Sequence, residues 1–142
     1  MTAIDVVRAD HREFRRLLLR AGTARRRSQR LLLERLGRRL WSHLGCEEEL
    51  LYPAAQRSPG RTTPLLERAL DSNAALYRRI PRRRAGDLRE AIAGLREGLE
   101  AHIRIVEGRV LREVRRRVSR RGLRTLAGRM AKRLAFAFDE LS

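Results

Sequence analysis

Three histidines, His11, His43 and His102, are the residues of this chain best suited to chemistry, and each falls on the apolar stripe of a segment with helical periodicity. Positions four apart lie on one face of a helix, so His43 and Glu47 project side by side from the same stripe. A carboxylate among leucines is costly to bury unless a charge or a cation offsets it. Histidines and glutamates that face a bundle interior are a recurring way to build metal sites. The pattern therefore predicts a buried metal site.

A further carboxylate and two polar residues complete the candidate site. Glu107 follows His102 by five residues, which is roughly 140° around an ideal helix, so both side chains can bind one centre only if the helix bends or contains a π-bulge. The third helical segment carries Asn73 and Tyr77 on its inner stripe. Asn73 is either a weak or water-holding ligand or a buried amide. Tyr77 is either a ligand or hydrogen-bond donor at the site or a core aromatic with a polar tip.

Four long amphipathic helices must position these residues, and the periodicity places them at about residues 2–20, 23–52, 62–80 and 87–119. Thr2 and Asp87 are the expected N-caps of the first and fourth, and Pro64 suits the first turn of the third. Gly122 interrupts the pattern, and an appended amphipathic segment follows. No alternating strand pattern is present. We therefore expect a single domain over 1–142, an all-α, antiparallel up-down-up-down four-helix bundle with a short C-terminal fifth helix.

Other catalytic arrangements find little support. All three histidines are placed in the core, so no Ser-His-Asp or Cys-His arrangement is available, and no glycine-rich phosphate loop occurs. Cys46 lies about 100° from Glu47 and is expected to pack rather than to bind metal. Of the three successive glutamates at 47–49, one should face inward and the others should be solvated or paired with arginines. Any enzyme activity should therefore come from the metal.

Three motifs together resemble the hemerythrin-like (HHE cation-binding) domain family over nearly the whole chain: Ala9-Asp10-His11-Arg12-Glu13, His43-x-x-x-Glu47 running into Leu50-Leu51-Tyr52-Pro53, and His102-x-x-x-x-Glu107. The resemblance implies a non-haem di-iron centre in which Glu47 and Glu107 bridge the ions, His11 and His43 bind one iron and His102 binds the other. It also implies a protein that interacts with dioxygen, peroxide or nitric oxide, by binding, sensing or a catalase-like activity. Where the family has one or two third-helix histidines, this chain has Asn73 and Tyr77, so one or two irons are expected.

The surface charge leaves a second interpretation open. The formal net charge is +17, and all but one of the 34 basic residues are arginine, the exception being Lys132. Such a surface fits either a metal-depleted basic bundle that binds nucleic acid or another anionic partner, or only a GC-rich coding sequence. With few aromatics and no recognition helix, specific nucleic-acid recognition is not expected. The lone cysteine and the lack of a signal peptide or membrane span suggest a soluble, cytoplasmic protein with no membrane partner.

Overall fold

A computed structural model describes residues 1–56, 58–81 and 86–141 of the chain, with side chains described up to residue 135. Its helical elements are α1 (Ala3–Thr23), α2 (Arg26–Cys46), η1 (Glu47–Leu51), α3 (Tyr52–Ala54), α4 (Pro64–Arg79), α5 (Leu88–Ile105), η2 (Val106–Val110), α6 (Leu111–Arg117) and α7 (Arg120–Leu141). The described residues contain no strand. The predicted all-α fold class is confirmed.

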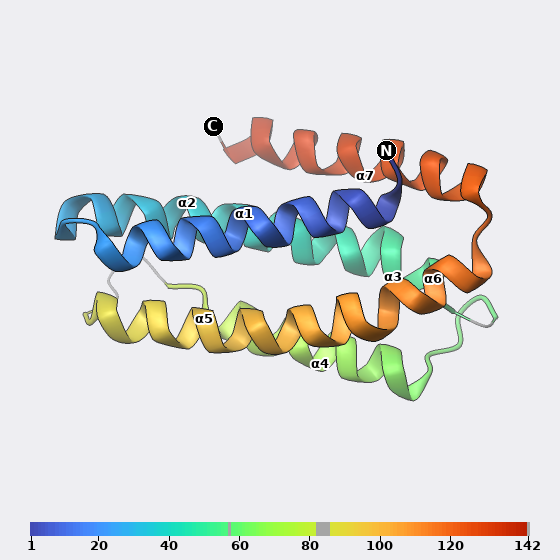
Figure 1. Ribbon diagram of the computed structural model, residues 1–142, viewed down its shortest axis with the longest axis horizontal. Helices are drawn as coiled ribbons and strands as arrows, with labels where there is room; N and C mark the ends of the chain where they lie inside the picture. The colour runs from blue at the N-terminus through green and yellow to red at the C-terminus, as the bar shows by residue number, and fades with distance from the viewer. Residues whose placement is uncertain (57, 82–85, 142) are drawn as a thin grey trace.

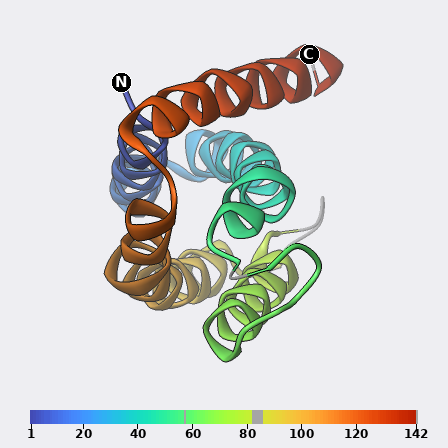
Figure 2. The same cartoon turned by 90° about the vertical axis from the view of Figure 1, so that its right-hand side faces the viewer.

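Successive long helices run in opposite directions (Figure 1), and in the end-on view α1 (blue) and α2 (cyan) lie side by side above α5 (yellow to brown) and α4 (green) (Figure 2). α1 packs beside α2, and α4 packs beside α5. Caps fix where these helices begin: the Thr2 hydroxyl accepts from the Asp5 N–H and Asp5 accepts from the Thr2 N–H, while Asp87 caps α5. The up-down-up-down bundle is therefore built from locally encoded helix starts and amphipathic faces.

Two of the long helices each contain a π-helical turn near the middle of the bundle. In η1 the Tyr52 N–H donates to the Glu47 carbonyl, and in η2 the Leu111 N–H donates to the Val106 carbonyl, each five residues back. α2, η1 and α3 thus form one continuous rod, as do α5, η2 and α6. A π-turn changes which face the following residues present. The bend or bulge expected after His102 is therefore present, and η1 adds one that the sequence did not predict.

The apolar core is divided into two clusters by a polar layer, which consists of the buried side chains of His11, His43, Glu47 and His102. One cluster lies toward the N-terminus of α1 and includes Val7, Tyr52 and Val106. The other lies toward its C-terminus and includes Phe14 and Leu99. The buried histidines occur between these clusters along their helices, as His11 does between Val7 and Phe14. Apolar packing on both sides therefore holds the polar layer at mid-bundle.

α7 differs from the short helix expected at the C-terminus, because it spans 22 residues and lies along α1 and α2 (Figure 1). Leu123, Leu126, Ala127 and Met130 are its buried residues among those whose side chains are described. The break before α7 falls at Val118, whose backbone is extended, and Gly122 lies inside the first turn. Gly122 predicts a break at its own position, because glycine is a weak helix former. Burial of the apolar stripe against α1 and α2 outweighs that propensity.

Other helix ends differ from expectation by a few residues. α1 extends past Gly22 to Thr23, and the α2–η1–α3 rod continues past Pro53 to Ala54. Proline lacks only its own N–H donor, and its carbonyl still accepts from the Gln56 N–H at 3.2 Å. Within the described part of the chain, no helix combines the length and the apolar character that crossing a bilayer requires.

Candidate metal centre

Four buried side chains meet in the polar layer: His11 from α1, His43 from α2, Glu47 from the start of η1 and His102 from α5. One ligand atom from each lies within 4.8 Å of the others, and each side chain is fully or almost fully buried. His43 and Glu47 are one helical turn apart, so the continuous rod of α2 and η1 presents two of the four groups. The cluster has the composition and compactness of a site that could hold a metal ion.

The atoms that face the centre of this cluster have no hydrogen-bond partner among the described residues. They are Nε2 of His11, His43 and His102 and both carboxylate oxygens of Glu47. Nε2 of His102 lies 3.1 Å and Nε2 of His43 lies 3.3 Å from Glu47 Oε1, but neither contact has hydrogen-bond geometry. Buried polar groups are almost always paired in folded proteins. Five buried polar atoms without a hydrogen bond, on side chains gathered in one cluster, form an arrangement that a bound cation would satisfy.

The outer nitrogen of each histidine is held by another helix. Nδ1 of His11 lies 2.8 Å from Glu107 Oε2, and Nδ1 of His43 lies 2.9 Å from Asp10 Oδ2. Carboxylates accept but do not donate when ionised, so each ring in its neutral form has its proton on Nδ1 and a lone pair on Nε2. A carboxylate behind a histidine fixes the ring and makes it a better metal ligand. Two of the three rings are thus oriented for binding toward the cluster.

Ser72 orients the third ring by a different route. Its hydroxyl donates to the Ala69 carbonyl at 2.8 Å and lies 3.1 Å from Nδ1 of His102. A serine hydroxyl has a single proton, and this one is used on Ala69, so Ser72 must accept from His102 Nδ1–H. The lone pair of His102 therefore also lies on Nε2, facing Glu47. All three imidazoles present the same nitrogen to the centre.

The electrostatics of the cluster follow from its burial. Burial, followed by the charge of His43, lowers the pKa of His11 to about 2. Burial also opposes protonation of His43, but the charge of Glu47 and the hydrogen bond to Asp10 raise its pKa to about 10. Although burial favours the neutral acid, His43 and His102 hold the pKa of Glu47 below its usual range. The carboxylate thus stays ionised, and the positive charge beside it can come from a protonated His43 or from a bound cation.

Glu107, expected as a ligand, lies on the outer side of His11 rather than in the four-residue cluster. Its carboxylate accepts from His11 and also lies 3.5 Å from Nε of Arg8. The π-turn η2, which begins at Val106, carries Glu107 toward α1, where its side chain is about a quarter exposed. The five-residue spacing from His102 therefore serves a contact to the neighbouring helix in this structure.

On α4, Asn73 is fully buried and belongs to a hydrogen-bonded chain. Its Oδ1 accepts from the Tyr52 hydroxyl at 2.9 Å, and its Nδ2 donates to Glu48 Oε1 at 3.2 Å. Burial and the charge of Glu47 raise the pKa of Tyr52 above its usual range, which keeps the phenol protonated. Tyr77 is half-buried and packs edge-on against Trp41, with ring centroids 4.7 Å apart. In this structure Asn73 is a buried, hydrogen-bonded amide and Tyr77 packs as an aromatic with a polar tip, and the ligand roles considered for them stay predictions.

Sequence reasoning missed several of these partners, namely Asp10, Ser72, Tyr52 and Glu48. Asp10, Glu48 and Ser72 are half-buried beside the core, so periodicity alone does not single them out, whereas Tyr52 belongs to the core itself. The expected split of the glutamates agrees with the structure: Glu47 is buried, Glu48 accepts from Asn73, and Glu49 pairs with Arg133 at 2.8 Å. Cys46 packs as expected, buried against α7.

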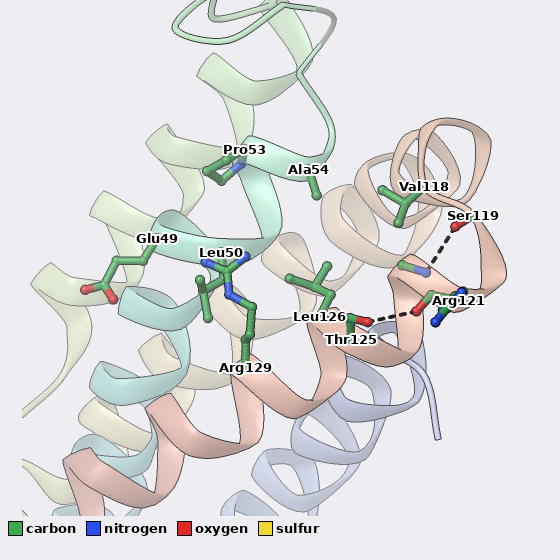
Figure 3. Close-up of a pocket in the computed structure, with 11 residues that line it drawn as sticks. Glu49, Leu50, Pro53, Ala54, Val118, Ser119, Arg121, Thr125, Leu126 and Arg129 are labelled. Carbon is green, nitrogen blue, oxygen red and sulfur yellow. Dashed lines mark hydrogen bonds between the residues drawn. The ribbon is translucent and has the colours of Figure 1, made fainter.

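A surface groove of about 590 Å³ lies apart from this cluster, between the η1–α3 end of the α2–η1–α3 rod and the start of α7 (Figure 3). Leu50, Pro53 and Leu126 form part of its apolar lining, and Arg121 and Arg129 contribute charge. None of the described residues that line it belongs to the histidine and glutamate cluster. The buried centre and the groove are therefore separate features.

Comparison with known proteins identifies the family. The hemerythrin HHE cation binding domain matches residues 2–114, a stretch that contains all four residues of the cluster together with Asp10, Ser72 and Glu107. It begins at the N-cap of α1 and ends in α6, so α7 lies outside it. No curated protein and no solved structure matched the chain. Since the match covers most of the sequence, the chain belongs to the hemerythrin HHE cation binding domain family.

Proposed function

We propose that this protein binds iron through His11, His43, Glu47 and His102, and that the iron interacts with dioxygen, peroxide or nitric oxide. The observation that carries this proposal is a set of five buried polar atoms that make no hydrogen bond and belong to the four clustered side chains. Each buried polar group left without a partner costs about 1–3 kcal/mol. A cation in the middle of the cluster would interact with all of them at once, and this interaction would offset the cost of burying them.

The donor chemistry supports iron. Imidazole and carboxylate ligands suit iron, and they also accept zinc or manganese, so the donors narrow the choice without deciding it. Four protein ligands leave open positions on an octahedral ion, and there iron would supply redox chemistry toward a small molecule. The chain's own part is to fix three Nε2 atoms and a carboxylate. The two apolar clusters on either side restrict access by water.

Metal analysis of the purified protein after anaerobic loading with ferrous iron tests this proposal. We expect bound iron in the wild type and an optical spectrum that changes when peroxide or nitric oxide is added. His43→Ala should lose the metal, while Trp41→Ala, two residues away and exposed, should retain it. Wild-type protein that is folded by circular dichroism but carries no metal after loading would overturn the proposal. Oxygen release from added peroxide then separates catalase-like turnover from binding or sensing.

A second candidate, binding of an anionic partner, has its best support in the C-terminal part of the chain. No acidic residue occurs between Glu113 and Asp139, although arginines stand at 115–117, 120, 121, 124, 129 and 133 together with Lys132. Those at 120, 121, 124 and 129 are exposed on α7, which lies outside the matched family domain. We propose non-specific, salt-sensitive binding to phosphate-rich partners at this helix, in addition to metal binding.

A further inference from the structure

We infer that the cluster holds one metal ion rather than two, bound by three histidines and one carboxylate. Tyr52, Asn73 and Glu48 are hydrogen-bonded to one another instead of binding a second ion. This inference rests on the proposed function, because it presumes that the cluster binds metal. It departs from the two-ion centre that the family resemblance implies.

The size of the cluster supports a single ion. Metal bonds to histidine nitrogen and carboxylate oxygen are about 2.0–2.2 Å long, so donors on opposite sides of one ion lie about 4 Å apart. Two ions in a shared site are about 3.5–4 Å apart, which spreads the outermost donors to roughly 8 Å. The four ligand atoms here all lie within 4.8 Å of one another. That separation fits one ion after a slight contraction.

The polar side chains of Tyr52, Asn73 and Glu48 are already paired with one another. Asn73 uses both ends of its amide, accepting from Tyr52 and donating to Glu48. A second ion bound through Asn73 or Glu48 would compete with these bonds, which are 2.9 and 3.2 Å long, and the amide oxygen that Asn73 offers is a weak ligand for iron.

Glu107 is also engaged, and releasing it would weaken the first site. Its carboxylate accepts from Nδ1 of His11 and contacts Arg8. Moving it inward to bridge two ions would leave a fully buried imidazole N–H without its acceptor, a loss comparable to that of any buried donor. Glu107 therefore serves the site best where it is, as the group that orients His11.

Manganese provides a clean measure of ion number. The purified full-length protein is saturated with Mn²⁺, the bound metal per chain is measured by elemental analysis, and electron paramagnetic resonance distinguishes an isolated ion from an exchange-coupled pair. We expect one ion per chain with the spectrum of an isolated ion. Two ions per chain with a coupled spectrum would overturn the inference and leave the proposed function standing. Folded protein without metal would overturn the proposed function itself.

Two conservative variants test the role of the hydrogen-bonded chain. Tyr52→Phe removes the donor to Asn73, and Glu48→Gln removes a carboxylate that a second ion could use while keeping an acceptor oxygen. We expect both variants to bind one Mn²⁺ with the wild-type spectrum, whereas His102→Ala should lower the affinity at least tenfold. If the wild type binds two ions, loss of one of them, or of spin coupling, in Glu48→Gln would show that Glu48 belongs to a second site and would refute the single-ion inference.

Discussion

Nδ1 of His11 and Oε2 of Glu107 lie 2.8 Å apart and join α1 to the π-turn η2 across the bundle. Because the histidine is fully buried and the glutamate is partly exposed, this contact connects the cluster to the surface and to Arg8. A carboxylate in this position sets the ring orientation and the basicity of Nε2. We therefore expect Glu107 to contribute to metal binding without being one of the four clustered groups.

Glu107→Gln should weaken metal affinity by about 10–100-fold, the usual effect of removing a carboxylate behind a metal-binding histidine. The amide retains an oxygen acceptor but loses the charge, so the ion count at saturation should not change. Competition with a chelator of known affinity measures the change. Glu100→Gln is the matched control, because Glu100 lies on the same α5–η2–α6 rod as Glu107 and pairs with Arg15 of α1 at the surface. Complete loss of metal in Glu107→Gln would instead identify Glu107 as a direct ligand.

Ser72→Ala should weaken metal affinity less than Glu107→Gln does. The substitution removes a neutral acceptor from His102 Nδ1–H, and neutral hydrogen bonds are about half as strong as those to a charged group. The same chelator competition applies, with Ser28→Ala on the exposed side of α2 as control. An unchanged affinity would mean that packing alone orients the His102 ring.

Asn73→His should raise the metal content from about one ion per chain toward two. The substitution removes the amide that donates to Glu48 and supplies an imidazole at the same buried position on α4. Elemental analysis and the spin-coupling spectrum of the Mn²⁺ form provide the readout. Asn73→Leu, which removes the amide without adding a ligand, should remain at one ion. Equal metal content in the two variants would show that residue 73 does not limit the ion count.

Met130→Ala should lower the free energy of unfolding by about 2–5 kcal/mol, the range found when a buried methionine is truncated. Met130 is almost fully buried where α7 meets the core. Urea denaturation followed by circular dichroism measures the change. Lys132→Ala, on the exposed face of the same helix, should stay within about 0.5 kcal/mol of wild type. If the two variants are equally stable, α7 does not contribute to the core in solution.

Binding to duplex DNA should weaken steeply with salt, with log K falling by about 0.9 per unit of log salt for each phosphate neutralised. Replacing three α7 arginines by glutamine should flatten this slope: Arg120, Arg121 and Arg124. A control variant removes the same charge from exposed positions on α4 and α5: Arg68, Arg78 and Arg89. Equal slopes in the two variants would assign any binding to overall charge instead of to α7.

Helical periodicity was sufficient to predict the bundle and to place His11, His43, Glu47 and His102 on inner stripes. The reason is local: an i to i+4 spacing determines the helix face whatever the rest of the chain does. The caps at Thr2 and Asp87 were predictable for the same reason, since a cap is a contact within one turn. Periodicity could not predict the length of α7, because a long polar helix forms only where a neighbouring surface buries its apolar stripe.

The sequence by itself determined that three imidazoles and a carboxylate face the interior of one helical bundle. Only the tertiary structure decided which side chains contact Nδ1 of each histidine. Asp10 adjoins His11 in sequence yet orients His43, and Ser72 adjoins Asn73 yet orients His102. These contacts cross between helices, so they depend on the relative rotation of the helices and, at Glu107, on a π-turn. Long-range packing sets that rotation, whereas the spacing of residues along one helix does not.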